Sequence, residues 1–244
     1  MKLGKAVVKS RFVILILAVA LMIPSALGMA FTRVNYDILS YLPDNLDTIK
    51  GQDYLLDDFG KGAFSFLIFE NMDDKDVVAT EEKIKEIDHV DTVLWYDDFA
   101  DISIPKEMLP DKIYDAFNSG NATMMAVFFD TSTSADETMN AIEEIRSVAG
   151  EQCFVSGMSA MITDMKNMFE EQEMIYVAIA VVLAVIAMMI FMDNWIIPFL
   201  FLANIGMAIV VNLGSNYFMG EISYVTKALA AVLQLAVTMD YSIF

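Results

Sequence analysis

Long apolar stretches lie at both ends of the chain, and a polar stretch separates them. The first, residues 12–31, holds no charged residue. As a helix rising about 1.5 Å per residue, it is about as long as a bilayer core is thick. Three more apolar stretches follow, at residues 174–192, 195–213 (with one internal amide, Asn204) and 224–244. The pattern predicts four transmembrane helices, with a tight turn at Asp193-Asn194 between the second and the third.

Residues 32–173 combine a strand pattern with a helix pattern. Residues 32–60 are expected to be an irregular lead-in because Pro43 and Gly51 interrupt them. Beyond them we predict strands at residues 63–70, 90–96, 122–129 and 152–156, and helices at residues 74–87 and 134–148. Ser134 is the expected N-cap of the second helix, with Glu137 three residues later. The order β-α-β, an acidic insertion at 97–120, then β-α-β predicts an α+β ferredoxin-like (βαββαβ) domain, and residues 159–173 are expected to be a helical linker.

Charge follows the same division. The chain is 57% apolar and only 20% charged, yet its formal net charge is −19. Residues 1–11 carry +4, residues 32–173 carry −21 and residues 174–244 carry −2. This segregation excludes a single soluble domain and a disordered acidic tail, and the sign of the charge argues against nucleic acid as a partner. We therefore expect three parts: a basic N-terminus with the first helix (1–31), an acidic domain (32–173) and three further helices (174–244).

The basic N-terminus also bears on location and orientation. A basic start, an apolar run and the small residues at 26–28 are also compatible with a cleaved signal peptide. We favour a retained anchor, because the run is longer than a typical signal core and more spans follow. Positive charge favours the cytoplasmic side, so residues 32–173 are expected outside the plasma membrane. The turn at 193–194 has no Lys or Arg, so this orientation depends on the N-terminus alone.

Most signatures of catalysis and cofactor binding are missing from the sequence. It contains no GxSxG, GxGxxG or P-loop motif. The single Cys153 cannot form an internal disulfide, and the single His89 excludes a multi-histidine metal site. We interpret His89 as a satisfied or exposed histidine rather than part of a catalytic triad, and the paired acids (57–58, 73–74 and 97–98) as solvated surface charge rather than cation sites. The sequence thus predicts no enzyme, no cofactor and no metal.

One carboxylate stands within an apolar stretch. Asp240 and its neighbour Tyr241 follow a run of mostly apolar residues from position 224. A carboxylate inside the hydrocarbon costs at least about 2.5–3.5 kcal/mol and is usually partnered or functional. Desolvation favours its neutral form, so Asp240 can take up and release protons, and Tyr241 can hydrogen-bond one protonation state. The alternative is that Asp240 marks the cytoplasmic end of the span. Lys227 lies too far along the helix to pair with it and is expected to snorkel.

The residues after Asp240 include no basic or turn residue. The last carbonyls of a membrane helix ending there would lack partners. We therefore expect the natural protein to continue beyond residue 244.

Three stretches carry a family resemblance: residues 36–45 (YDILSYLPDN), 155–165 (VSGMSAMITDM) and 238–244 (TMDYSIF). With one span, an outer domain and then further spans, the chain resembles the N-terminal half of a resistance–nodulation–division transporter, in the mycobacterial-membrane-protein-large (MMPL) branch. The resemblance implies a proton-driven exporter of hydrophobic or amphiphilic molecules. It also implies a proton relay at Asp240 and Tyr241, and a second, C-terminal repeat of the same protein as partner. Two alternatives stay open: a non-transporting auxiliary or sterol-sensing-type lipid receptor, and an anchored surface enzyme.

Overall fold

The computed structural model describes residues 8–37, 39–43, 45–100, 104, 108, 110–191 and 196–243. The predicted turn at residues 193–194 lies outside this set. The chain divides into two compact units, one formed by Met1–Asn35 with Met168–Phe244, the other by Tyr36–Asn167. We call the first the helical unit and the second the α+β unit. Helix α7 (Met158–Phe191) contributes its first part to the α+β unit and the rest to the helical unit.

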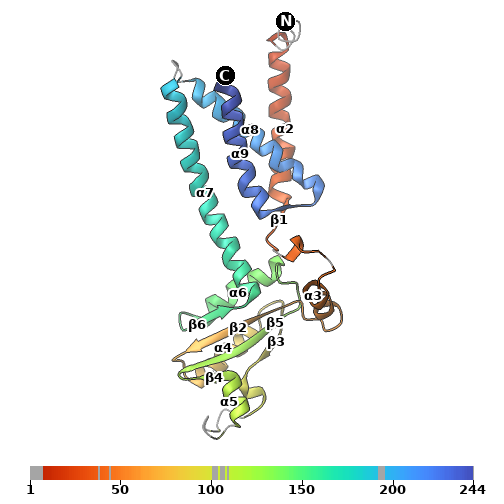
Figure 1. The fold of residues 1–244 in the computed structure, drawn as a ribbon, viewed down its shortest axis with the longest axis vertical. Coiled ribbons are helices and arrows are strands. Elements are labelled where there is room, and N and C mark those ends of the chain that lie inside the picture. The colour runs from red at the N-terminus through yellow and green to blue at the C-terminus, as the bar shows by residue number, and fades with distance from the viewer. Residues whose placement is uncertain are drawn as a thin grey trace. The chain divides into compact units, whose positions relative to one another are not determined.

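Apolar helices build the helical unit (Figure 1). They are α2 (Arg11–Phe31), the later part of α7, α8 (Ile197–Ser215) and α9 (Tyr224–Ile243). Among the described residues, three helices are long and apolar enough to cross a membrane, and they contain α2, α7 and α8. The apolar part of α9 whose side chains are described, Tyr224–Val237, is shorter, so the fourth span stays a prediction. The chain is a multi-pass membrane protein on this basis.

Small residues allow α2 and α8 to pack closely. Ser25 and Gly28 of α2 and Gly214 of α8 are buried. A β-carbon on Gly214 would lie 2.1 Å from the carbonyl oxygen of Ser25, a separation that no side chain tolerates. Helix pairs in membranes use such small residues because no hydrophobic force drives apolar helices together in lipid. Near this crossing, β1 (Arg33–Asn35) pairs in parallel with β7 (Glu221–Ser223), and the short 3₁₀ helix η4 (Asn216–Met219) joins α8 to β7.

The α+β unit contains one main sheet. In the part of the chain that the structure describes, the strands lie in the order β3-β5-β2-β6, and β4 pairs with β5 outside that path. Their bounds are β2 (Ala63–Glu70), β3 (Val90–Leu94), β4 (Asn118–Ser119), β5 (Ala122–Phe129) and β6 (Cys153–Ser156). All the pairings are antiparallel. The two strands predicted at 63–70 and 122–129 are confirmed to the residue. Each alternates a buried with a more exposed position, which is the pattern of a strand with one face on a core.

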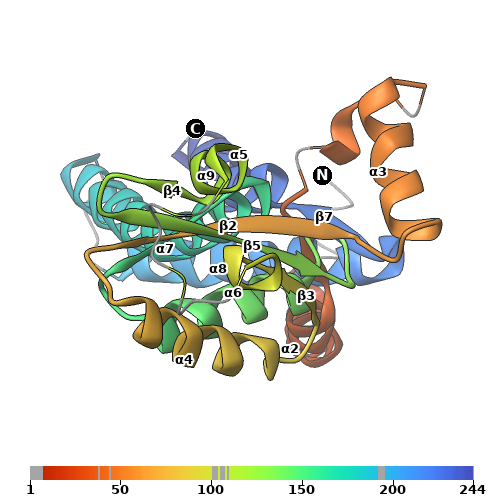
Figure 2. The ribbon, with the colours of Figure 1, turned by 90° about the horizontal axis from the view of Figure 1, so that it is seen from below.

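Two helices cover one face of this sheet. Helices α4 (Asp74–Lys85) and α6 (Asp136–Ala149) contact each other, and both lie below β2 and β5 in the view of Figure 2. The core lies between these helices and the buried side of the strands. Its largest fully buried side chains include Leu67, Phe69, Ile84, Trp95, Met125, Phe129, Ile142 and Ile145. On the opposite side of the sheet, Phe64 and Phe154 stay exposed.

Several local predictions were wrong. The lead-in at 32–60 contains helix α3 (Asp47–Asp57) and a 3₁₀ turn, η1 (Leu39–Tyr41). The insertion at 97–120 contains η2 (Tyr96–Asp98), α5 (Asp111–Phe117) and β4. Ser134 is not the N-cap of α6, which begins at Asp136 after Ala135 and has no side-chain cap. The shorter of these elements, such as η1, η2 and β4, lack the two or three turns of periodic sequence that a pattern needs.

Candidate functional site

The predicted relay residues lie near the end of α9. Asp240 and Tyr241 fall within the helix (Tyr224–Ile243), but their side chains lie outside what the structure describes. Their role therefore stays a prediction. The nearest polar side chain before them that the structure describes is Gln234, six residues or about 9 Å back along the helix axis. The surroundings of Gln234 therefore define the part of the candidate site that the structure describes.

Gln234 forms a hydrogen bond with α8. The Nδ2 of Asn212 donates to the Oε1 of Gln234 over 3.1 Å. Both amides belong to otherwise apolar helices, where a polar side chain is expensive unless it finds a partner. The bond therefore links α8 to α9 at one depth and gives each amide one partner.

An open hollow of about 670 Å³ lies beside this amide pair. Most of its lining is apolar, but it carries the polar side chains of Asn204, Asn212 and Ser215 from α8 and Gln234 from α9, and Ala18 and Leu21 of α2 border it. On α8 these polar residues recur at intervals of eight and three, which places them on one face of the helix. The polar side chains in this hollow can bind ordered water.

A second cavity within the helical unit is almost entirely apolar. It measures about 590 Å³ and lies between α2, α8 and η4, lined by side chains such as Leu21, Pro24, Leu27, Phe31, Val211 and Phe218. Pockets of a few hundred Å³ with apolar walls bind small apolar ligands. Leu21 and Val211 line this cavity and the hollow alike, so the two share a wall.

Lys227 has a partner at the other end of α9. Its Nζ lies 3.8 Å from Oε2 of Glu173 on α7, and both side chains are about one quarter exposed. That Lys227 snorkels stays a prediction, since an ion pair near the end of the span is compatible with it. The pair accounts for the only base in residues 174–244.

The α+β unit contains a histidine, a cysteine and an acidic cluster that could carry chemistry. His89 is confirmed as a satisfied, partly exposed histidine, because its Nδ1 lies 3.0 Å from Oδ1 of Asp130. Burial raises the pKa of the Cys153 thiol to about 12, so it is not a nucleophile at neutral pH. Within the described residues, one group of acidic side chains is close enough to share a metal ion: Glu81, Asp97 and Asp98. The sequence had pointed to the pair at 97–98 but not to Glu81.

Sequence reasoning also missed the amide pair. It noted Asn204 but neither Asn212 nor Gln234. The signal was present, because Asn204 and Asn212 are eight residues apart in an apolar helix and so lie on one face. That Gln234 meets this face depends on how α8 and α9 pack, which their separate patterns do not contain.

The comparison with protein families adds an independent finding. A model described as the MMPL family matches residues 108–244, which is more than half of the chain. The match extends from the second half of the α+β unit through α7, α8 and α9. No curated protein matches the chain.

Proposed function

Because the chain belongs to the MMPL family, whose members are membrane transporters of the resistance–nodulation–division superfamily, we propose that it forms the N-terminal part of a proton-motive-force-driven exporter. The exported molecules are hydrophobic or amphiphilic, of lipid-like or drug-like character. The observation that carries the proposal is the presence, in the helical unit, of a hollow with four polar side chains next to an almost entirely apolar cavity. The polar side chains suit protons and water, and the apolar cavity suits a lipid-like chain.

Asp240 and Tyr241 form the proton relay in this proposal. The cost of a carboxylate within the hydrocarbon makes Asp240 a group that changes its protonation state rather than a structural one. The amides of Asn212 and Gln234 support this role because they bring hydrogen-bonding groups to within two turns of Asp240 along α9. In this proposal the second repeat of the same protein supplies the remaining relay partners.

The proposed topology assigns each part of the chain to a side of the membrane or to a span. The N-terminus lies in the cytoplasm, α2 crosses the plasma membrane, residues 32–173 lie outside, and α7, α8 and α9 form the second to fourth spans. The outer part is a ferredoxin-like domain, and the strand order β3-β5-β2-β6 with α4 and α6 on one face supports this. We propose that this domain guides substrate and performs no enzymatic reaction.

The test is the substitution Asp240→Asn in the protein as its gene encodes it. Export of a fluorescent amphiphile from proteoliposomes under an imposed pH gradient is expected to fall to background, while the amount of protein in the membrane stays unchanged. Glu171→Gln, which removes an exposed carboxylate from α7, is the matched control and should transport normally. Undiminished export by Asp240→Asn contradicts the relay.

The same assay distinguishes the second candidate function from that of an exporter. A preparation that binds the amphiphile but moves none of it under any pH gradient indicates a non-transporting auxiliary or a sterol-sensing-type lipid receptor. Activity of residues 32–173 on a soluble substrate indicates a surface enzyme instead.

A further inference from the structure

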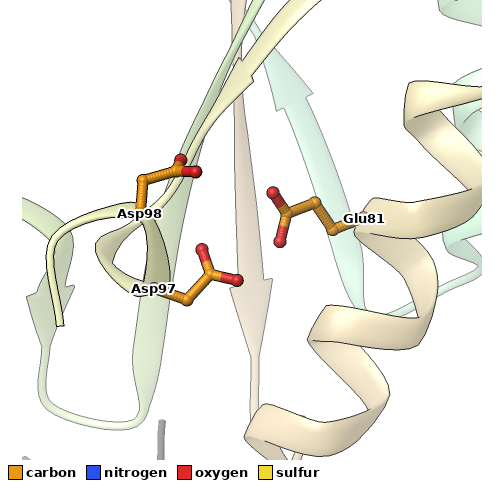
Figure 3. A group of neighbouring side chains, drawn as sticks. All are labelled: Glu81, Asp97 and Asp98. Carbon is orange, nitrogen blue, oxygen red and sulfur yellow. The ribbon is translucent and has the colours of Figure 1, made fainter. Parts of the chain in front are cut away.

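Three carboxylates from two separate elements converge in the α+β unit. Glu81 comes from α4, while Asp97 and Asp98 belong to η2, which directly follows β3. One oxygen from each lies within 4.8 Å of the others, and Figure 3 shows the three carboxylates pointing toward one another. Two oxygens bound to one Ca²⁺ at about 2.4 Å can be at most about 4.8 Å apart. The cluster therefore has the dimensions of a single cation site.

Two buried oxygens of the cluster form no hydrogen bond in the described structure, although one of them is paired with the ammonium of Lys85. Glu81 is only 1% exposed. Its Oε1 and the Oδ1 of Asp97 have no hydrogen-bond partner among the described residues. A buried carboxylate oxygen without a partner, such as Oδ1 of Asp97, is costly, and Figure 3 shows the Glu81 carboxylate turned toward Asp97 and Asp98. This points to a positive ligand between them.

The positive charge of Lys85 balances only part of the negative charge of the three carboxylates. The Nζ of Lys85, one turn further along α4, forms an ion pair with Oε1 of Glu81 over 2.5 Å, and the Lys85 side chain is 47% exposed. One ammonium against three carboxylates leaves an excess of two negative charges. On the far side of the cluster, the backbone N–H of Trp95 donates to Oδ2 of Asp98 over 3.0 Å. The remaining charge equals that of one divalent cation.

We propose that Glu81, Asp97 and Asp98 bind one Ca²⁺ ion. Carboxylate oxygens are hard ligands, and Ca²⁺ accepts irregular sets of six to eight oxygens, whereas Mg²⁺ demands near-ideal octahedral geometry. Water fills the positions that the three side chains leave open. The ion ties the middle of α4 to the end of β3, where the 97–120 insertion begins. On the proposed topology the site faces the outside of the cell, where sites of this kind have dissociation constants of about 10⁻⁴–10⁻³ M.

The experiment uses the full chain purified in detergent. Trp195→Phe leaves Trp95, next to the cluster, as the only tryptophan. Thermal unfolding followed by Trp95 fluorescence is measured in EGTA and during a CaCl₂ titration. The midpoint is expected to rise with Ca²⁺ and to saturate with one ion bound per chain, as counted by radioactive ⁴⁵Ca²⁺. Glu81→Gln, which keeps the shape of the side chain, should lower the affinity at least about tenfold, and Asp98→Asn, at a more exposed position, should also lower it.

The matched control is Glu82→Gln. Glu82 is the exposed neighbour of Glu81 on α4, so its loss changes the net charge equally and should leave Ca²⁺ binding intact. An equal loss of binding in Glu82→Gln overturns the proposal, since the ion would then be held by general surface charge. An unchanged midpoint in Ca²⁺ overturns it too, and indicates a proton shared between Glu81 and Asp97. An equal rise with Mg²⁺ at the same concentrations overturns the assignment to Ca²⁺.

Discussion

Gly28 of α2 and Gly214 of α8 meet backbone to backbone: a β-carbon added to Gly28 would lie 2.5 Å from the carbonyl oxygen of Gly214. Any side chain at either position must push the helices apart, because the obstructing atoms belong to the main chain. The contact also positions both cavities of the helical unit, since Leu21 and Val211 line them from the same two helices.

Gly28→Ala is therefore expected to weaken the packing of α2 on α8. Overpacking of a close contact costs about 1–3 kcal/mol, which should lower the midpoint of thermal or SDS-induced unfolding in detergent. Gly206→Ala is the control on α8, because an added β-carbon there meets no atom within 4 Å and alanine favours helix. Equal effects of the two substitutions would show that the close contact does not limit stability.

Thr123→Val is expected to destabilise the α+β unit. The Nε1 of the fully buried Trp95 donates to Oγ1 of Thr123 over 2.8 Å, and valine has the same shape without the acceptor. An indole N–H left unpaired in the core costs about 1–3 kcal/mol. Unfolding followed by Trp95 fluorescence in the Trp195→Phe background measures the loss. Thr48→Val, at an exposed position of α3, should change stability by less than about 0.5 kcal/mol.

The amide pair of α8 and α9 should show energetic coupling. A double-mutant cycle of Asn212→Leu and Gln234→Leu is expected to give about 0.6 kcal/mol, and at most about 1.7 kcal/mol, the range for hydrogen bonds between membrane helices. The cycle of Asn204→Leu with Gln234→Leu is the comparison, because Asn204 lines the same cavity but forms no hydrogen bond with Gln234 in the described structure. Coupling of the same size in both cycles would contradict a direct bond.

The strands of the α+β unit were predictable because their signal is local. Residues 63–70 and 122–129 alternate buried and more exposed side chains along their whole length, and alternation of period two is visible in a single sequence. The apolar helices were predictable because a long apolar run is also a local signal, although their observed ends differ from the predicted ends by a few residues. Helix α3 was missed because Gly51, which predicts an interruption, lies inside it, and none of its eleven residues is buried.

The candidate sites were less predictable because they depend on pairs far apart in the sequence. Asp97 and Asp98 looked like surface charge, and only the packing of α4 against the end of β3 brings Glu81 to them. Asn212 and Gln234 are separated by 22 residues and meet through the packing of α8 on α9. Asp240 could be singled out from the sequence, since a carboxylate in an apolar run is conspicuous by itself.

The stability of the α+β unit should depend on pH through Glu81. Burial raises the pKa of Glu81 above its ordinary value of 4.5, with Asp97 and Asp98 adding to the effect and Lys85 opposing it. Between the ordinary and the raised pKa, the folded chain keeps a proton that the unfolded chain has released. Stability contributed by this group is therefore present below pH 4.5 and falls as the pH rises through the raised pKa.

In EGTA, Glu81→Gln should remove this decline, because glutamine stays neutral at every pH, whereas Glu82→Gln should keep it. The unfolding midpoint of Trp95 fluorescence, measured from pH 4.5 upward in the Trp195→Phe background, reports the difference. Lys85 does not interfere, since its own pKa is raised from 10.5 and it stays charged throughout this range. Ca²⁺ competes with the proton for the same oxygens, so the stabilisation by Ca²⁺ should grow as the pH rises. A decline that persists in Glu81→Gln would assign the titration to another carboxyl group.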